Sequence, residues 1–201
     1  ELTRNKVANY RKHAVMTFCG GTVVEAAIIR GQVDKTLRTL KGIGLEAIEL
    51  SDNIVELNLN EKTELIKKAV DAGFEVLFEY GKKYDHDPID VDRATKEIET
   101  LRKAGANRII LERSQLDATL GASGELPTAE RLQELVDRIG MSSLIFEAET
   151  AAHMLYLIHK FGADVNLGPN ISAEYVASNL EPARCGLGRA EGYSFFEKLR
   201  S

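Results

Sequence analysis

Carboxylate and amide side chains recur at or near the ends of short apolar runs along this sequence. The residues concerned are Glu25, Glu49, Glu79, Glu112, Glu147 and Asn166. Carboxylates serve in proteins as cation ligands and as acids or bases, so their placement can carry chemistry. If the runs are parallel strands, their polar ends meet at one edge of the sheet. The pattern therefore predicts one shared site.

The elements that would position this site alternate along the chain. A helical segment precedes five of the apolar runs and stops at a glycine after cationic residues, which is typical of a helix C-terminus. These glycines are Gly44, Gly73, Gly105, Gly140 and Gly162. The sequence predicts strands over residues 14–19, 47–51, 76–80, 108–112, 144–147 and 165–167. It predicts helices over residues 3–13, 33–41, 60–72, 91–103, 128–139, 151–161 and 173–179.

The predicted strands are apolar on both faces, which is typical of parallel strands covered by helices. Strict alternation of strand and helix predicts a single α/β domain of the (β/α)₈ TIM-barrel type. Only about six βα units are predicted in this chain. We therefore expect that one or two N-terminal units of the barrel are not included. An open doubly wound sheet is the alternative, although Gly20-Gly21 lacks the third glycine of a dinucleotide-binding turn.

Composition excludes several classes of protein. The 201 residues carry a formal net charge of −5, and the Lys and Arg residues are dispersed, which argues against a nucleic-acid surface. No apolar stretch approaches the roughly 20 residues of a membrane span. Two cysteines are too few for a disulfide framework. These features predict a cytoplasmic protein that binds neither nucleic acid nor membrane.

Short motifs spread over the whole chain resemble those of the phosphosulfolactate synthase family. Each match is short, but their order and spacing together are specific. They are Gly20-Gly21-Thr22 with Glu25, Ala47-Ile48-Glu49 with Ser51-Asp52, Glu79 with Gly81-Lys82-Lys83, Ile145-Phe146-Glu147-Ala148, and Val165-Asn166-Leu167-Gly168.

The resemblance implies a (β/α)₈ enzyme that belongs to coenzyme M biosynthesis and forms a homo-oligomer. Enzymes of this family add sulfite to carbon 3 of phosphoenolpyruvate in the presence of Mg²⁺ and produce phosphosulfolactate. Because sulfite is the nucleophile, the protein need only stabilise the charge that develops on the substrate and deliver a proton to carbon 2.

Roles for individual residues follow from the resemblance. Lys82 is the predicted proton donor, with Glu49 as a second catalytic residue. The predicted Mg²⁺ ligands are Glu79, Glu112 and Glu147, and the residues predicted to bind substrate are Gly20, Gly21, Lys83, Arg113, Asn166 and Gly168. Other interpretations remain open, because Gly20-Gly21 could form only a tight turn and Lys82-Lys83 only a surface charge run.

The sequence departs from the family pattern in loops near the predicted site. Glu149 stands where the family commonly has proline, Pro169 is inserted before Asn170, and Arg113 directly follows Glu112 instead of lying two positions on. Loops decide the chemistry of a barrel. The alternative to a lyase is therefore a diverged paralogue, non-catalytic or stress-related, that binds a small phosphorylated ligand.

Overall fold

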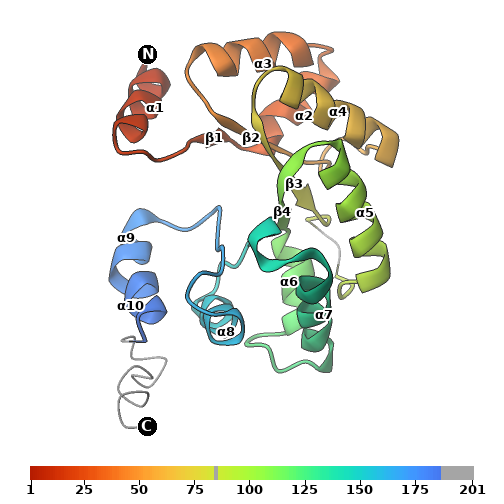
Figure 1. Cartoon of the computed structure of the whole chain (residues 1–201), viewed down its shortest axis with the longest axis vertical. Coiled ribbons are helices and arrows are strands. Elements are labelled where there is room, and N and C mark those ends of the chain that lie inside the picture. Colours follow the sequence, from red (N-terminus) through yellow and green to blue (C-terminus); the bar gives the residue numbers. More distant parts are fainter. Residues whose placement is uncertain (84–85, 187–201) are drawn as a thin grey trace. The chain divides into compact units, whose positions relative to one another are not determined.

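The computed structural model describes residues 1–83 and 86–186, and the chain divides into two compact units (Figure 1). The first unit comprises Glu1–Lys82 and Asp92–Ile110, and the second comprises Lys83–Val91 and Leu111–Ser201. The prediction of a single barrel domain is not tested by this division and stays a prediction. In the described ranges, none of the helices has the length and apolar character needed to cross a bilayer.

The strands of the described residues form a parallel sheet of five in the order β1-β2-β3-β4-β5, which confirms the predicted α/β class. The bounds are β1 (Phe18–Cys19), β2 (Ala47–Leu50), β3 (Glu75–Tyr80), β4 (Ala106–Leu111) and β5 (Leu144–Phe146). In register, Phe18 lies opposite Ala47, and Glu49 lies opposite Leu77. The predicted sixth strand is reduced to one parallel bridge between Phe146 and Leu167. A closed barrel stays a prediction.

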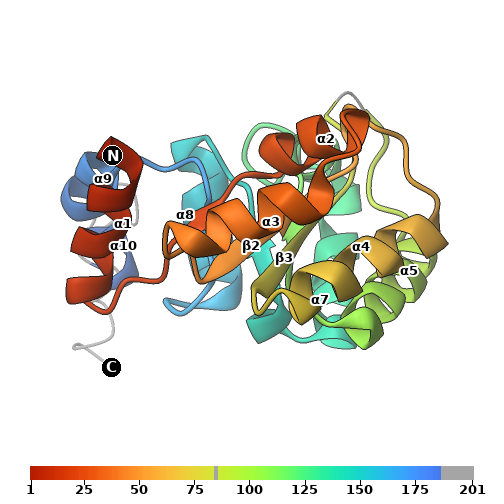
Figure 2. The ribbon, with the colours of Figure 1, turned by 90° about the horizontal axis from the view of Figure 1, so that it is seen from above.

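Helices α1 to α5 belong to the first unit. Their bounds are α1 (Leu2–Lys12), α2 (Gly21–Ile29), α3 (Val33–Gly42), α4 (Leu59–Asp71) and α5 (Val91–Ala104). Figure 2 shows α3 and α4 running along one side of β2 and β3. Asn58 and Glu61 form a reciprocal capping box that begins α4, and Ile66 of this helix is fully buried. Burying the apolar face of such a helix is what fixes it against the sheet.

The remaining described helices belong to the second unit. They are α6 (Arg113–Leu120), α7 (Glu130–Ile139), α8 (Ala151–Phe161), α9 (Ala173–Tyr175) and α10 (Glu181–Arg184), with single turns η1 (Pro127–Ala129), η2 (Met141–Ser143) and η3 (Val176–Leu180). The rings of Phe146 and Phe161 stack with centroids 5.7 Å apart, which packs β5 against the end of α8. The predicted helix over 173–179 is thus a short α9 continued by the π-helical turn η3.

The five predicted helix-ending glycines all have positive φ, between 83° and 119°. Two other predictions were wrong. The run to Glu25 is not strand after Cys19 but helix α2, because Gly20 adopts an extended conformation and lets a helix begin at Gly21. Helix α6 was missed, since it starts at Arg113 directly after Glu112 and has only eight residues.

Candidate functional site

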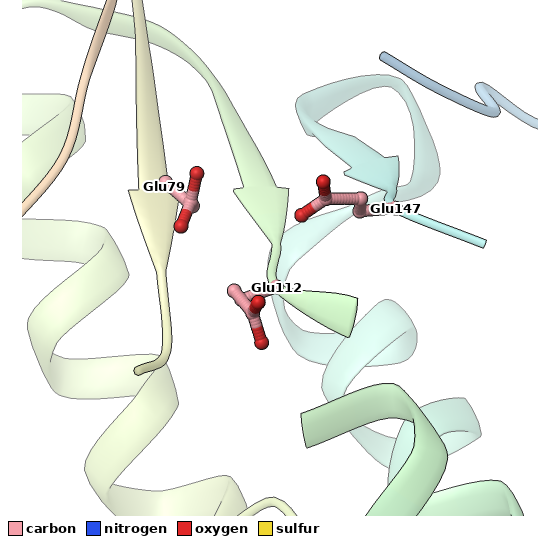
Figure 3. Close-up of side chains that lie close together, drawn as sticks. All are labelled: Glu79, Glu112 and Glu147. Atoms are coloured by element: carbon pink, nitrogen blue, oxygen red, sulfur yellow. The ribbon is translucent and has the colours of Figure 1, made fainter. Parts of the chain in front are cut away.

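The three predicted cation ligands end three successive strands of the sheet, as Figure 3 shows. Glu79 is the residue before the end of β3, Glu112 directly follows β4, and Glu147 directly follows β5. All three side chains are buried, with exposed fractions of 6%, 4% and 7%. A buried carboxylate is costly unless it is paired, hydrogen-bonded or bound to a cation. Their burial therefore requires specific partners.

Glu112 and Glu147, both in the second unit, bring two carboxylates close together. A carboxylate oxygen of one lies within 4.8 Å of a carboxylate oxygen of the other. The backbone holds them in register, because the Glu147 N–H donates to the Leu111 carbonyl at 3.1 Å. Glu112 is the N-cap residue of α6, and its Oε2 accepts a hydrogen bond from the Ser114 N–H. Asn170 Nδ2 donates to Glu147 Oε1. These donors orient both carboxylates.

In the first unit Glu79 has a different donor. Asn53 Nδ2, in the loop after β2, donates to Glu79 Oε1 at 2.5 Å. The amide thus fixes one oxygen of Glu79 at the end of β3. Its predicted role as a third cation ligand stays a prediction.

A pocket of about 610 Å³ lies in the second unit over Glu112 and Glu147. Its lining residues are Lys83, His86, Glu112, Arg113, Ser114, Asp117, Ala118, Glu147, Glu149 and Asn170. Lys83 and Arg113, predicted to bind anions, therefore share a pocket with two of the predicted cation ligands. A pocket with a few convergent charged groups is the ordinary form of a small-ligand site.

Arg113 is held by two carboxylates of this lining. Its Nε donates to Asp117 Oδ2 at 3.3 Å, and its Nη1 donates to Glu149. Asp117 in turn faces the buried His153, whose Nδ1 lies 3.3 Å from Asp117 Oδ1. His153 Nε2 lies 2.5 Å from the Gly121 carbonyl, which can only accept, so Nε2 carries a proton. The His153 ring therefore lies beside Asp117, and its Nδ1 makes no hydrogen bond in the described part of the chain.

Lys82, the predicted proton donor, belongs to an ion-pair chain in the first unit. Its Nζ donates to Asp52 Oδ2 at 2.8 Å and to the Asp52 carbonyl at 2.6 Å. Asp52 is only 3% exposed and also pairs with Lys62 at 3.1 Å, while Lys62 pairs with Glu97 at 2.7 Å. Lys82 keeps a side-chain exposure of 43%. It is therefore an oriented cation with one side open, and its catalytic role stays a prediction.

Gly20 and Gly21, both predicted to bind substrate, differ sharply in the space around them. A Cβ on Gly21 would lie 2.2 Å from Ser51 Oγ, whereas a Cβ on Gly20 would meet nothing within 4 Å. The Gly21 N–H donates to Glu49 Oε1 at 2.8 Å. Glu49 is the third residue of β2, and its carboxylate accepts the hydrogen bond of the first amide of α2. An anion could use that amide only in place of Glu49.

Glu25 is fully engaged inside the first unit. Its Oε1 accepts from Ser51 Oγ at 2.5 Å, and its Oε2 accepts from the N–H groups of Ile54 and Val55. With 1% exposure it anchors the loop after β2 to α2. The expectation that Glu25 sits at a strand end was wrong, because it lies within α2.

Asn166 and Gly168, also predicted to bind substrate, lie in the loop region after α8. Asn166 Nδ2 donates to the Leu144 carbonyl at 3.0 Å, which ties this segment to β5. Gly168 has φ +146° and precedes Pro169 through a cis peptide bond. Neither belongs to the described lining of the 610 Å³ pocket. Their contact with substrate stays a prediction.

Sequence reasoning missed Asp117, Ser114 and Asn170 as residues of this pocket. For Asp117 a signal existed, since an acid four residues after Arg113 lies on the same face of a helix. That signal required α6, which was not predicted. Asn170 reaches Glu147 across 23 positions of sequence, so no local pattern indicates it.

The chain is similar to known proteins over most of its length. It matches the sequence model of the family described as (2R)-phospho-3-sulfolactate synthase (ComA) over residues 1–189. A phosphosulfolactate synthase of Methanothermobacter thermautotrophicus is 34% identical over 194 residues, which cover 93% of this chain and 73% of that protein. One of Methanocaldococcus jannaschii is 34% identical over 192 residues, which cover 93% and 75%. Among solved structures, a phosphoenolpyruvate phosphomutase of Streptomyces platensis matches with TM-score 0.48 and 17% identity, over 85% of this chain and 57% of that one.

Proposed function

The chain belongs to the phosphosulfolactate synthase family, and on that premise we propose that it is a Mg²⁺-dependent lyase that joins sulfite to phosphoenolpyruvate and yields phosphosulfolactate. The observation that carries the proposal is the pairing of Glu112 and Glu147. Two buried carboxylates with oxygens within 4.8 Å stand in a pocket that also presents Lys83 and Arg113. A cation site beside anion-binding side chains suits a substrate with carboxylate and phosphate groups.

The donor set fits a hard divalent cation. Glu112 and Glu147 supply anionic oxygens, and Ser114 and Asn170 orient them by hydrogen bonds, as outer partners of metal ligands do. Glu79 is proposed as the third ligand, because it ends the strand that neighbours β4 in the sheet. When bound, Mg²⁺ would supply positive charge that stabilises the electrons gathering on the substrate carboxylate.

The reaction forms one bond to sulfur and one to hydrogen. The sulfur lone pair of sulfite attacks carbon 3 of phosphoenolpyruvate, and the electrons of the double bond move to carbon 2, which takes a proton. We propose Lys82 as the donor of that proton. Asp52, only 3% exposed, orients its ammonium, and the 43% exposure of the Lys82 side chain leaves it accessible. Positioned general acids of this kind contribute about 10²- to 10⁴-fold to a rate.

Lys83 and Arg113 are proposed to bind the anionic groups of the substrates. Both line the pocket, and guanidinium and ammonium groups are the usual partners of phosphate, carboxylate and sulfite. Gly20, Gly21, Glu49, Asn166 and Gly168 remain proposed as substrate-binding or catalytic residues on the family resemblance alone.

One observation favours the alternative of a non-catalytic paralogue that binds a small phosphorylated ligand. Arg113 is already paired with Asp117 and Glu149, and this leaves less of its charge for a reacting substrate. A paralogue of this kind would bind phosphoenolpyruvate without consuming it.

An omission assay tests the proposal. Purified protein should consume phosphoenolpyruvate only when sulfite and Mg²⁺ are both present, and phosphorus NMR should show a new organic phosphate with no release of inorganic phosphate. Folded protein that binds phosphoenolpyruvate but leaves it intact under all conditions would favour the paralogue. A cytoplasmic location and a homo-oligomer are further proposals, and sedimentation of a compact monomer would contradict the second.

A further inference from the structure

The pocket of the second unit contains an arginine whose charge is already paired with carboxylates of the same chain. Arg113 donates to both Glu149 and Asp117, and all three line the pocket. We propose that Glu149 occupies the place on Arg113 that an oxyanion of the ligand takes, so that Glu149 sets how tightly the pocket binds oxyanions. The identity of that oxyanion rests on the proposed function, but the competition does not.

Asp117 lies on the same helix as Arg113, four residues further on, whereas Glu149 lies outside that helix. Asp117 Oδ1 faces His153, which is 3% exposed and anchored on the Gly121 carbonyl, and Asp117 Oδ2 accepts from Arg113. Within residues 1–83 and 86–186, Arg113 is the single hydrogen-bond or ion-pair partner of Glu149. The carboxylate of Glu149 can therefore leave without breaking any other contact, while Asp117 keeps the guanidinium in place.

Glu149 is also well placed to move. It lies in the short segment between Glu147 and Thr150, the N-cap residue whose side chain accepts from the His153 N–H and begins α8. Its side chain is 38% exposed and that of Arg113 is 46% exposed. Exposed ion pairs contribute little to stability, because water competes for both partners. An oxyanion that binds the guanidinium through two oxygens competes well against such a pair.

The charges of the lining point the same way. Four carboxylates, those of Glu112, Asp117, Glu147 and Glu149, stand against the cations of Lys83 and Arg113. An incoming oxyanion thus meets an excess of negative charge unless a cation is bound to Glu112 and Glu147. Losing the charge of Glu149 would reduce that excess at the position nearest Arg113. The resulting gain in affinity should be roughly 1.4- to 5-fold, the range of a partly exposed ion pair.

Two anions present the required chemistry, sulfite and phosphate, and calorimetric titration separates them. Sulfite and inorganic phosphate are titrated in separate experiments, at one fixed Mg²⁺ concentration, into the wild-type protein and into Glu149→Gln. We expect Glu149→Gln to bind at least one of them roughly 1.4- to 5-fold more tightly. The anion that shows the gain identifies the group that Arg113 receives.

Glu134→Gln is the matched control. Glu134 pairs with Arg138 on α7, with side-chain exposures of 52% and 39%, and lies outside the pocket lining, so the substitution changes the net charge equally. Equal gains in the two variants, or no gain in Glu149→Gln with either anion, would overturn the proposal. The double variant Arg113→Gln/Glu149→Gln should show no gain. The readout here is anion binding, which is independent of catalysis. A gain in affinity in Glu149→Gln, combined with a wild-type protein that leaves phosphoenolpyruvate intact in the omission assay, would reject the lyase proposal and leave this inference standing.

Discussion

Replacing Gly21 with alanine should destabilise the protein, whereas the same change at Gly20 should not. A Cβ at position 21 would lie 2.2 Å from Ser51 Oγ and 2.8 Å from Ser51 Cβ. Ser51 cannot simply rotate away, because its hydroxyl donates to the buried carboxylate of Glu25 at 2.5 Å. Moving α2 outward would instead stretch the hydrogen bond from the Gly21 N–H to Glu49. Every way of relieving the clash costs a buried contact.

The magnitude follows from these contacts. Overpacking costs about 1–3 kcal/mol. A buried polar group that loses its partner adds about 1–3 kcal/mol. The better helix propensity of alanine returns up to about 1 kcal/mol. We therefore expect Gly21→Ala to lower the free energy of unfolding by about 1–5 kcal/mol, set against the roughly 5–15 kcal/mol of an ordinary domain.

Gly20 provides the control in the adjacent position. It has φ −67° and ψ 152°, which alanine adopts without strain, and its Cβ would meet no atom within 4 Å. Urea unfolding followed by circular dichroism should place Gly20→Ala within about 0.5 kcal/mol of wild type. Equal stabilities of the two variants would refute the close approach of α2 to Ser51. Weakened substrate binding in a stable Gly20→Ala protein would support the predicted binding role of this glycine.

Two further predictions concern Lys82 and Glu125. Lys82→Met should lower kcat by roughly 10²- to 10⁴-fold with little change in KM. Lys82→Arg should not restore kcat, because arginine can pair with Asp52 but cannot release a proton near neutrality. Full activity of Lys82→Arg would show that Lys82 is not the general acid. For Glu125, N–H donors of Ala122 and Ser123 lower the carboxyl pKa from 4.5 to about 2, so its stabilising effect is present above pH 4.5 and is lost as the pH falls towards 2. Thermal melts of Glu125→Gln should therefore show a lower Tm than wild type at pH 7 and the same Tm near pH 2, and a Tm difference that persists at pH 2 would contradict this assignment.

Much of the fold could be predicted because its signals are local. Glycines with positive φ end the helices, as at Gly44 and Gly140, and apolar runs mark β2 to β5. The errors arose where a local signal was ambiguous. Val23 and Val24 favour a strand by propensity, yet they lie in α2, where Val24 packs in the core with 1% exposure. The structural context overrode the preference of single residues.

The contents of the site were less predictable, since most of its contacts join residues far apart in sequence. Strand-end position was sufficient to indicate Glu112 and Glu147, because parallel strands bring their ends together. It could not indicate that Asp52 pairs with Lys82 over 30 positions, or that Glu149 pairs with Arg113 over 36. The two carboxylates that pair with Arg113 come from regions that the periodicity of the sequence did not define. Asp117 lies in helix α6, and Glu149 lies in the loop before α8. Side-chain pairing of this kind depends on tertiary packing.

We propose that Glu112 and Glu147 hold the Mg²⁺ of a lyase that consumes phosphoenolpyruvate and sulfite. The most direct measurement is the Mg²⁺ dependence of sulfite-dependent phosphoenolpyruvate consumption in wild type, in Glu147→Gln, and in Glu134→Gln as the control for net charge. If this proposal is right, Glu147→Gln raises the Mg²⁺ concentration for half-maximal rate by about 10-fold or more, because one anionic ligand is lost, while the control behaves as wild type. A rate that does not depend on Mg²⁺, or an unchanged Mg²⁺ requirement in Glu147→Gln, would contradict it.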